Sequence, residues 1–310
     1  MRRFILDVFS SPTLDFIDGR LCRGGPAYYA NLALQAIGAL DFEVRLPYDP
    51  CIDTSWYLRT EWCLDNIDSN IMASIRGCVT MFALEEGIDR RRLRLLKRYK
   101  IEDVYPGGVA ALVSPVLYEY GFDVVTRIAS HYSLSILDLQ GFARLHDGHN
   151  VVSFSELALQ FASIADSNRF TSVKASIEDI NNMLMLERLL NYSSSSSNTA
   201  LIITNGPKGV FVTYEDYTFI VKPRPVENMP TGAGDMLATL ILYSLWSGYD
   251  LDYSVLKAAS AVSCILERRD KVSDKGYNLC TNAYTDGHRA KLYRLPGSCH
   301  SIDCVISAFE

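Results

Sequence analysis

The sequence predicts an α/β protein with a mostly parallel central sheet and helices on both of its faces. The first observation is a strand-then-helix rhythm from residue 109 onward, with short apolar strands at 110–114, 134–141 and 170–174. Parallel strands need crossover connections, usually helices, so this alternation is typical of such a sheet. The second observation is an apolar helix at 236–243 with almost no polar interruption, which we therefore expect to be buried.

Composition narrows the class of protein. The chain has 310 residues, of which 48% are hydrophobic and 21% charged, as in ordinary soluble proteins. A formal net charge of −6 and a pI near 5.5 argue against a nucleic-acid-binding surface. No apolar run is long enough to cross a bilayer, and residues 1–7 have the pattern of a first strand and not of a signal peptide. We therefore expect a cytoplasmic protein with neither a nucleic-acid nor a membrane partner.

The eight cysteines do not form a metal-binding pattern. No C-x-x-C pair occurs, and no histidine stands at zinc-finger spacing, so we expect no metal cluster. Most of the cysteines are expected to be buried thiols. The late trio Cys280, Cys299 and Cys304 would include a disulfide if the host is a hyperthermophile.

The first third of the chain combines strands with a glycine turn. A strand is predicted at 3–8, and Asp15 follows it where parallel α/β sheets place ligand-binding residues. Asp15 is either a substrate ligand or a solvated loop carboxylate. Gly24 and Gly25 form a tight turn that leaves room for a ligand and opens a helix, which Gly38 ends.

Residues 41–105 turn to a β pattern. The segments 79–85 and 91–97 flank a short connection and predict a hairpin. The alternative is that the basic cluster at 90–100 forms an amphipathic helix or an anion-binding patch.

Later elements follow the alternation described above. Helices are predicted at 116–131, 156–165, 180–192 and 251–268, and further strands at 151–155, 200–204 and 210–212. The five serines at 193–197 have no capacity to pack and predict a surface loop.

The stretch with the clearest chemistry is Thr231-Gly232-Ala233-Gly234-Asp235, which leads directly into the apolar helix. Glycines free the backbone, and the unpaired N–H groups of a helix start attract anions such as phosphate. Asp235 is a helix cap in the simplest interpretation. Beside a bound phosphoryl group it would also stand where a base for an incoming hydroxyl is needed.

This stretch resembles the signature of the ribokinase-like (PfkB) carbohydrate kinase family. Three other segments agree with that family in the expected order: the glycine turn and helix at 23–38, the segment 174–179, and Thr204-x-Gly206-x-x-Gly209. The segment Asp138-Leu139-Gln140-Gly141, followed by Arg144, is similar to a strand-end motif of members that act on sugars and polyols. The resemblance implies a ribokinase-like fold with a small β-sheet lid, and it favours the hairpin at 79–97.

The resemblance also implies roles for residues. Asp235 would be the catalytic base, with Gly232, Ala233 and Gly234 stabilising the transferred group. The remaining candidates are Thr204, Gly206, Gly209 and Thr231 for the nucleotide, Asp15, Gly24, Gly25, Tyr29, Gln140 and Arg144 for the substrate, and Asp179 and Glu178 for Mg²⁺ through water. The cofactors implied are ATP and Mg²⁺.

Three positions depart from the family pattern. Tyr29 stands where many members carry a substrate-binding Asn, so the acceptor pocket differs from that of ribokinase. The magnesium element Asn-x-x-Glu is replaced by Ser176-x-x-Asp179. Met229 stands where many members place an Asp for a monovalent cation, and a thioether is a poor ligand for such an ion, so we expect weak or absent activation by K⁺.

The implied function is transfer of the γ-phosphoryl group of ATP to a hydroxyl of a small sugar or polyol, inositol-like compounds included. The alternatives are a nucleoside kinase, or a catalytically silent binding protein, on the same fold. A dinucleotide oxidoreductase is excluded because no Gly-x-Gly-x-x-Gly follows the first strand. We expect one domain, 1–310, with the lid built mainly from residues within 12–23 and 41–105, and a homodimer formed through that lid.

Overall fold

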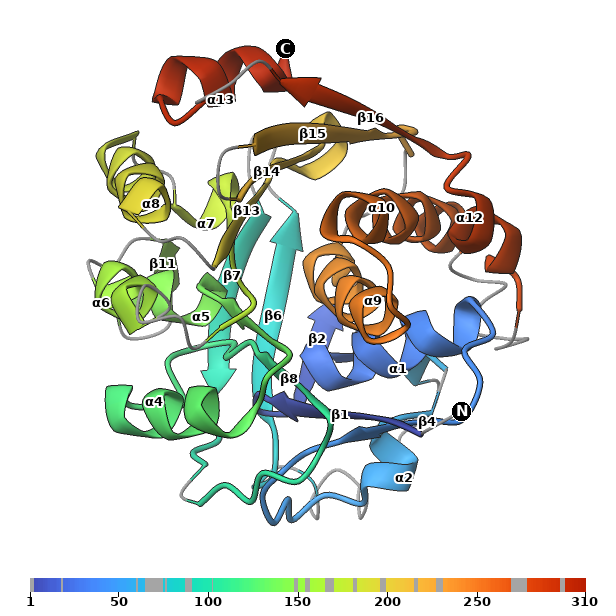
Figure 1. Cartoon of the computed structure of the whole chain (residues 1–310). Coiled ribbons are helices and arrows are strands. Elements are labelled where there is room, and N and C mark those ends of the chain that lie inside the picture. The colour runs from blue at the N-terminus through green and yellow to red at the C-terminus, as the bar shows by residue number, and fades with distance from the viewer. Residues whose placement is uncertain are drawn as a thin grey trace.

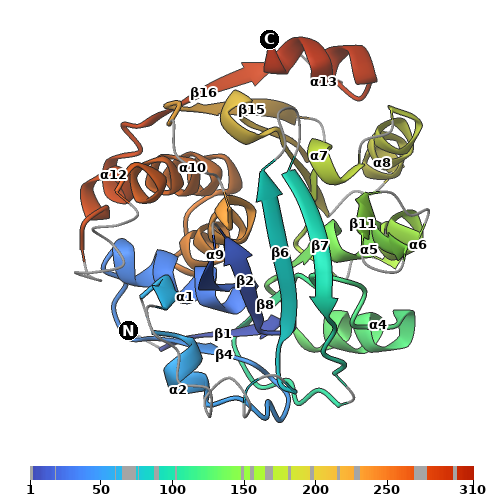
Figure 2. The same cartoon turned by 180° about the vertical axis from the view of Figure 1, so that it is seen from behind.

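The computed structural model describes residues 3–17, 19–59, 61–64, 75, 77–86, 91–101, 103–147, 150–153, 157–164, 170–180, 183–195, 199–214, 217–226, 231–268, 278–295 and 299–310. Within these residues the chain forms a nine-stranded sheet covered by helices and a second, seven-stranded sheet (Figures 1 and 2). The predicted α/β class, with a mostly parallel central sheet and a separate smaller sheet, is confirmed.

The main sheet is parallel through six strands and antiparallel at one edge. The parallel strands, in spatial order, are β4 (Phe42–Arg45), β1 (Phe4–Phe9), β8 (Ala110–Val113), β9 (Ser135–Asp138), β12 (Ser172–Ser176) and β13 (Ala200–Thr204). The antiparallel strands are β14 (Val210–Tyr214), β15 (Tyr217–Pro223) and β16 (Ala290–Leu295).

Both faces of this sheet are buried, because alternate residues of its strands join two different hydrophobic clusters. In β8, Leu112 packs with one cluster and Val113 with the other. The first face carries α1 (Pro26–Ala36), α9 (Ala233–Trp246), α10 (Leu251–Glu267) and α12 (Thr281–Asp286). The second carries α4 (Phe122–His131), α6 (Leu157–Ile164), α8 (Met183–Ser195) and α13 (Ile302–Phe309).

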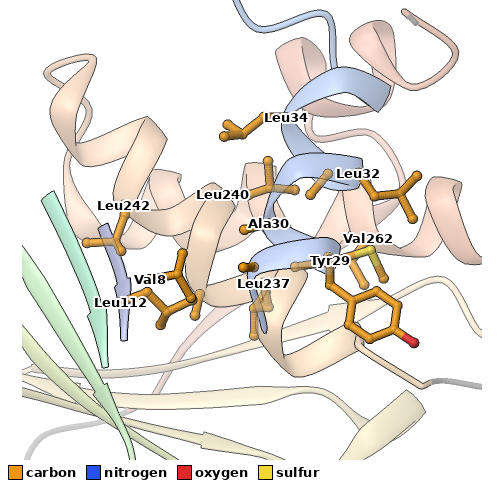
Figure 3. Packing of buried hydrophobic residues seen from close by; sticks show 14 of the residues in the cluster. Val8, Tyr29, Ala30, Leu32, Leu34, Leu112, Leu237, Leu240, Leu242 and Val262 are labelled. Carbon is orange, nitrogen blue, oxygen red and sulfur yellow. The ribbon is translucent and has the colours of Figure 1, made fainter. Parts of the chain in front are cut away.

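Helix α9 lies at the centre of the first face, as its uninterrupted apolar sequence predicted. It packs against α1 and α10, and Leu237, Leu240 and Leu242 are all 4% exposed or less (Figure 3). Because neighbouring elements cover the helix on both sides, its sequence can be apolar all round and lacks a polar face. Its first turn is thereby held rigidly over the ends of the parallel strands.

The second sheet runs in the order β10 (Arg144–Asp147), β11 (Asn150–Ser153), β7 (Arg91–Lys97), β6 (Thr80–Glu86), β2 (Thr13–Ile17), β3 (Arg20–Gly24) and β5 (Cys63–Leu64). Strands β6 and β7 are antiparallel neighbours, so the hairpin expected at 79–97 is confirmed and the helical alternative for the basic cluster is wrong. The short helix α2 (Thr54–Tyr57) lies in the same part of the chain.

Three expected elements differ from the structure. Strand β11 does not join the parallel sheet but pairs antiparallel with β10 and β7 in the second sheet. The helix expected at 180–192 is instead α7 (Ile177–Ile180) and α8, and α8 runs into the serine run as far as Ser195. Serine is tolerated in a last helical turn, so a polar run alone does not mark the helix end.

The helix expected at 116–131 begins only at Phe122. The Glu119 carboxylate accepts hydrogen bonds from the backbone N–H groups of Val116 and Leu117 and from Ser11. Val116 and Leu117 also pack against Phe82 and Leu95 of the second sheet. These tertiary contacts satisfy the backbone in a non-helical form, with Tyr118 at φ 50°, and override the local helix preference.

The expectation of mostly buried thiols is wrong, since all eight cysteines form disulfides. The pairs are Cys22–Cys63, Cys51–Cys78, Cys264–Cys280 and Cys299–Cys304. Cysteines 41 residues apart meet because β3 and β5 are paired strands, a proximity that sequence spacing does not reveal. None of the helices described is long and apolar enough to span a membrane.

Candidate active site

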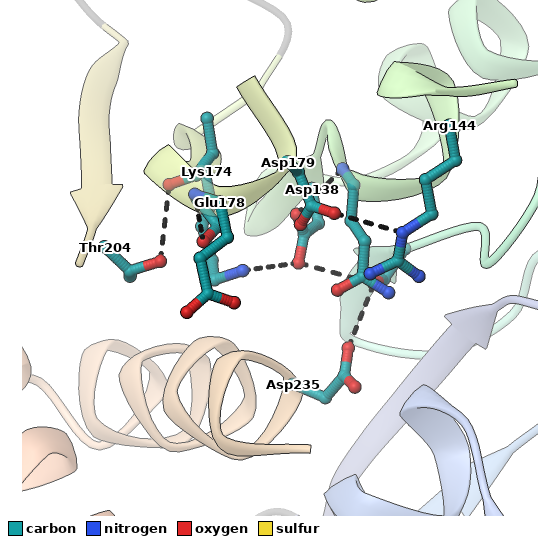
Figure 4. Close-up of polar contacts among 11 residues, drawn as sticks. Asp138, Arg144, Lys174, Glu178, Asp179, Thr204 and Asp235 are labelled. Atoms are coloured by element: carbon teal, nitrogen blue, oxygen red, sulfur yellow. Dashed lines mark hydrogen bonds and ion pairs between the residues drawn. The ribbon is translucent and has the colours of Figure 1, made fainter. Parts of the chain in front are cut away.

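The candidate site lies where neighbouring parallel strands of the main sheet end. Ser114 follows the last residue of β8, Asp138 ends β9, Lys174 lies near the end of β12 and Thr204 ends β13. Carboxyl ends of parallel strands share one edge of the sheet, which is where such folds bind ligands. The first turn of α9 faces the same edge and brings Asp235 to it (Figure 4).

A chain of polar contacts connects three of these strands to α9. The Lys174 ammonium donates to Asp138 Oδ2 at 2.6 Å, and Ser114 Oγ donates to Asp235 Oδ1 at 3.1 Å. Ser114 also lies 3.5 Å from Asp138 Oδ2. All of these side chains are almost completely buried, so the strengths of these contacts are those of a low-dielectric environment.

Asp235 is a poor match for an ordinary helix cap, because it is only 6% exposed. Burial raises its pKa from 3.8 to about 7, and the nearby negative charge of Asp138 adds to this effect. Lys174, the Ser114 hydrogen bond and Arg144 act in the opposite direction. A carboxylate with a pKa near neutrality can accept a proton from a hydroxyl and release it again.

The glycine turn before Asp235 is shaped by close contacts. Gly232 has φ 79°, and a Cβ on it would stand 2.4 Å from the ring of Tyr29. A Cβ on Gly234 would stand 2.9 Å from the ammonium nitrogen of Lys174. Gly232 therefore requires glycine for its backbone conformation as well as for space, whereas a side chain at position 234 would displace the Lys174 ammonium. The backbone N–H groups of the turn are left at a helix N-terminus, where an anion is favoured.

Asp15, expected as a substrate ligand, lies within β2 and not in a solvated loop. It is 7% exposed, and its Oδ1 has no hydrogen-bond partner among the atoms described. Burial raises its pKa to about 7, against an opposing effect of Arg144. A Cβ on Gly24 would stand 2.2 Å from Asp15 Oδ2, so the glycine makes room for this carboxylate. A buried oxygen without a partner is ready to accept a ligand hydroxyl.

Other expected substrate residues lie at the starts of α1 and α5. Gly25 caps α1 with φ 82°, and a Cβ there would come within 3.1 Å of Thr13 Oγ1 and Tyr57 Oη. Tyr29 is only 2% exposed, with its ring against the Gly232 turn. Gln140 is half-buried, and its backbone N–H donates to Asp138 Oδ1 at 3.2 Å.

The residues expected to serve Mg²⁺ start α7. Asp179 Oδ1 accepts from Arg144 Nε at 3.0 Å, and the Glu178 side chain is exposed. In the described part of the chain no group of three or more His, Cys, Asp or Glu residues could hold a metal ion. Mg²⁺ commonly keeps several waters and uses only one or two protein carboxylates together with phosphate oxygens, and these two side chains fit that use.

The expected nucleotide segment follows β13. Thr204 Oγ1 donates to the carbonyl of Ala175 at 3.4 Å, which joins the ends of β13 and β12. Gly206 opens a short 3₁₀ turn, η2 (Gly206–Lys208), and Gly209 has φ 133° with Val221 close by. Thr231 is half-buried at the start of the glycine turn, whereas Met229 lies outside the described residues, so the weak K⁺ dependence stays a prediction.

Four site residues were not assigned from the sequence: Ser114, Asp138, Lys174 and Tyr57. Tyr57 donates to the carbonyl of Gly24 and accepts from the Thr13 N–H, which fixes the turn beside Asp15. Two signals were available in the sequence: the charged Lys174 inside an apolar strand, and Asp138 at the start of the strand-end motif 138–141. The sequence around Tyr57 carried no such signal, because its partners Thr13 and Gly24 are far away along the chain.

Comparisons with known proteins agree with this geometry. Residues 164–274 match the profile described as pfkB family carbohydrate kinase. No curated protein matches the chain by sequence.

Solved structures resemble the fold over most of the chain. A pyrophosphate-dependent kinase in the ribokinase family, in complex with sulfate, is 15% identical with a TM-score of 0.61, and the match covers 85% of this chain and 95% of that one. Ribokinase from Cryptococcus neoformans var. grubii serotype A, in complex with ADP, is 14% identical with a TM-score of 0.55 (93% and 99% covered). A nucleoside kinase from Methanocaldococcus jannaschii is 14% identical with a TM-score of 0.55, and the match covers 93% of this chain and 97% of that one.

The fold is therefore ribokinase-like. Within it, residues 164–274, which include the glycine turn and Asp235, match the PfkB family, and this supports a PfkB-type carbohydrate kinase.

Proposed function

We propose that this protein is an ATP-dependent kinase that transfers the γ-phosphoryl group to a hydroxyl of a small sugar or polyol. The observation that carries the proposal is Asp235: a buried carboxyl with a pKa of about 7 in the first turn of a helix, next to a glycine turn. This combination places a proton acceptor beside an anion site, which is what in-line phosphoryl transfer to a hydroxyl requires.

Each residue has a defined task in the proposed reaction. Asp235 accepts the proton of the attacking hydroxyl, while the backbone N–H groups of Gly232, Ala233 and Gly234 stabilise charge on the transferred group. Asp15, with its unpartnered oxygen, accepts hydrogen bonds from other hydroxyls of the acceptor. Bound Mg²⁺, which Glu178 and Asp179 would hold through water, supplies charge neutralisation at the phosphates.

A sugar or polyol is favoured as acceptor by the polar side chains at this edge of the sheet. Asp15 comes from β2, and Arg144, which lowers the pKa of Asp15 electrostatically, comes from β10. Gln140 is held at the same edge by the hydrogen bond of its backbone N–H to Asp138, and its side chain is an amide. Several charged and amide groups suit an acceptor that presents several hydroxyls. One structure of similar fold, a pyrophosphate-dependent kinase of the ribokinase family, is a complex with myo-inositol.

Compartment and assembly are further parts of the proposal. We propose a cytoplasmic enzyme, because ATP is available there, and a homodimer formed through the second sheet acting as a lid. Light scattering at high protein concentration tests the assembly, and a clean monomer would remove the dimer.

The deciding experiment is a kinase screen across sugars, inositols and nucleosides, with ATP or pyrophosphate as donor and with or without Mg²⁺. Turnover of a sugar or polyol with ATP is the expected result. Turnover of nucleosides alone would reassign the acceptor. Donor binding without any turnover would instead identify a silent binding protein on this fold.

A further inference from the structure

Lys174 is a buried cation that the reaction outlined above does not yet use. It lies in β12 and is 1% exposed, and its ammonium forms an ion pair with Asp138 Oδ2 at 2.6 Å. Burial by itself lowers the pKa of Lys174, but Asp138 and the nearby carboxylates of Asp235 and Asp179 raise it overall. The side chain is therefore protonated, and it places a fixed positive charge inside the protein.

The position of this charge is specific. The Lys174 ammonium lies directly against the first turn of α9, where a Cβ on Gly234 would stand 2.9 Å from it. An ammonium has three donors, and Asp138 accepts from one of them. A positive charge here adds to the field of the unpaired N–H groups at the helix start.

Hydrogen bonds and short contacts connect Lys174 to Asp235 through Asp138 and Ser114. Asp138 ends β9, and its Oδ2 lies 3.5 Å from Ser114 Oγ, which in turn donates to Asp235. Asp138 disfavours the charged form of Asp235, whereas Lys174 favours it. Arg144 from β10 also favours the charged form.

We propose that Lys174 is a positioning residue for phosphoryl transfer: an internal cation beneath the glycine turn that favours negative charge on Asp235 and on an anion bound at the turn. This inference rests on the proposed function, since phosphoryl transfer is what brings an anion to the turn. Lys174 is too buried to contact the acceptor, so it acts through its charge and through Asp138. In a low-dielectric interior such a charge acts over several ångströms.

The first test measures the pKa of Asp235 directly by carbon NMR of its carboxyl, assigned by comparison with Asp235→Asn. In Lys174→Met the pKa is expected to rise by about one unit, because a nearby opposite charge commonly lowers a carboxyl pKa by at least this much. The acid limb of the kcat/KM profile should move by the same amount. A lysine with a purely structural role would leave both unchanged.

The second readout is thermal stabilisation by inorganic pyrophosphate, used as the anion probe. Affinity for it should fall by roughly tenfold in Lys174→Met, which is the effect of one partly screened charge. Lys257→Met is the matched control. Lys257 is an equally buried lysine, 2% exposed, but its ammonium is held among Tyr249, Tyr253 and Tyr284 and not at the site. We expect that variant to keep the wild-type Asp235 pKa and pyrophosphate affinity.

Removing Lys174 alone leaves Asp138 buried and unpaired, which can prevent folding. The same comparison is therefore also made in an Asp138→Asn background, where residue 138 carries no charge that needs Lys174 as its partner. Adding Lys174→Met to that background should again raise the Asp235 pKa. An unchanged pKa and an unchanged pyrophosphate affinity in both backgrounds would overturn the inference. Failure of the kinase screen with a shifted pKa would count against the proposed function and leave the charge effect of Lys174 standing.

Discussion

At the scale of single residues, burial decides what Asp235 can do. An exposed aspartate in a first helical turn stabilises the helix by at most about 1 kcal/mol and keeps its ordinary pKa. Here the carboxyl is removed from water and lies near Asp138, so that its pKa is raised to about 7. A carboxyl with this pKa can accept and release a proton near neutral pH, which the proposed role as base requires.

Replacement of Asp235 by Asn separates these two roles. Asparagine also caps helices well, so the fold should be kept. If Asp235 is the base, kcat should fall by roughly 10²–10⁴ while KM changes far less, because the lost interaction belongs to the transition state. The measurement pairs kcat with the melting temperature. A variant that melts normally and keeps most of its activity would contradict the assignment.

The raised pKa of Asp235 predicts two pH dependences. Because the base must be ionised, kcat/KM should rise with pH and reach half its plateau near pH 7. Ionising a buried carboxyl also costs stability: the stability that Asp235 contributes is fully present below its ordinary pKa of 3.8 and is lost as the pH rises through about 7.

Asp235→Asn should therefore gain stability relative to the wild type between pH 4 and 8, by about 1.4 kcal/mol for each unit of pKa shift at most. Denaturant titrations of both proteins at pH 4, 6 and 8 measure this difference. A difference that stays constant across that range would show that the pKa of Asp235 is not raised.

At the scale of elements, the start of α9 and the middle of β1 are each held by a few specific contacts. The glycine turn before α9 is folded around the Tyr29 ring of α1. Asp7 of β1 is fully buried and accepts hydrogen bonds from Arg45 on β4, from the N–H groups of Gly107 and Gly108, and from Tyr132 after α4. Both arrangements tie together segments that are distant in sequence.

Gly232→Ala tests the turn. Its Cβ would overlap the Tyr29 ring at 2.4 Å and would also force a non-glycine residue to φ 79°, so both stability and anion binding should be lost in large part. Gly248→Ala is the matched control, because Gly248 has φ 90° but open space around it. We expect the control to cost only about 1 kcal/mol. Equal losses in the two variants, measured by thermal melting, would show that contact with Tyr29 is unimportant.

Asp7→Asn tests the hydrogen bonds that Asp7 of β1 accepts from Arg45, Gly107 and Gly108. Removing the charge leaves Arg45 without its partner and disturbs the bonds to Gly107 and Gly108, so the free energy of unfolding should fall by about 3–5 kcal/mol. The comparison is Asp252→Asn, whose partner Arg294 is 76% exposed. That exposed pair should contribute under about 1 kcal/mol. Denaturant unfolding of the two variants at pH 7 measures the contrast.

At the scale of the whole molecule, four disulfides join segments of the chain that the two sheets and the helices bring together. Cys22–Cys63 closes 41 residues within the second sheet, and Cys299–Cys304 closes only five near α13. A crosslink mainly removes freedom from the unfolded chain, and this effect grows with loop length. Disulfides persist mainly in oxidising compartments, and among cytoplasmic proteins they are found chiefly in hyperthermophiles.

Each disulfide can be removed by Cys→Ala at both of its positions. The free energy of unfolding should then fall by an amount that grows with the length of the loop that the disulfide closed. The loss for Cys22–Cys63 should be about 4 kcal/mol and that for Cys299–Cys304 about 2 kcal/mol, with the other two pairs between them. Thermal melting of the four variants, without reductant, gives the order. An inverted order would show that local packing and not chain entropy sets the contribution of these crosslinks.

The sequence by itself determined the features that are encoded locally. Hydrophobic periodicity predicted the α/β class, the buried helix α9 and the hairpin of β6 and β7, because each pattern repeats within a few residues. The glycine turn and Asp235 were visible for the same reason, since an anion-binding helix start needs only neighbouring residues.

Only the tertiary structure decided which distant residues meet. Strand order brings Lys174 to Asp138 and Ser114 to Asp235, and it pairs Cys22 with Cys63. The Glu119 carboxylate and the strands of the second sheet keep residues 116–121 out of the helix that their sequence favours. Such contacts depend on which elements become neighbours in space, and burial among those neighbours then sets the charge of Asp15, Lys174 and Asp235.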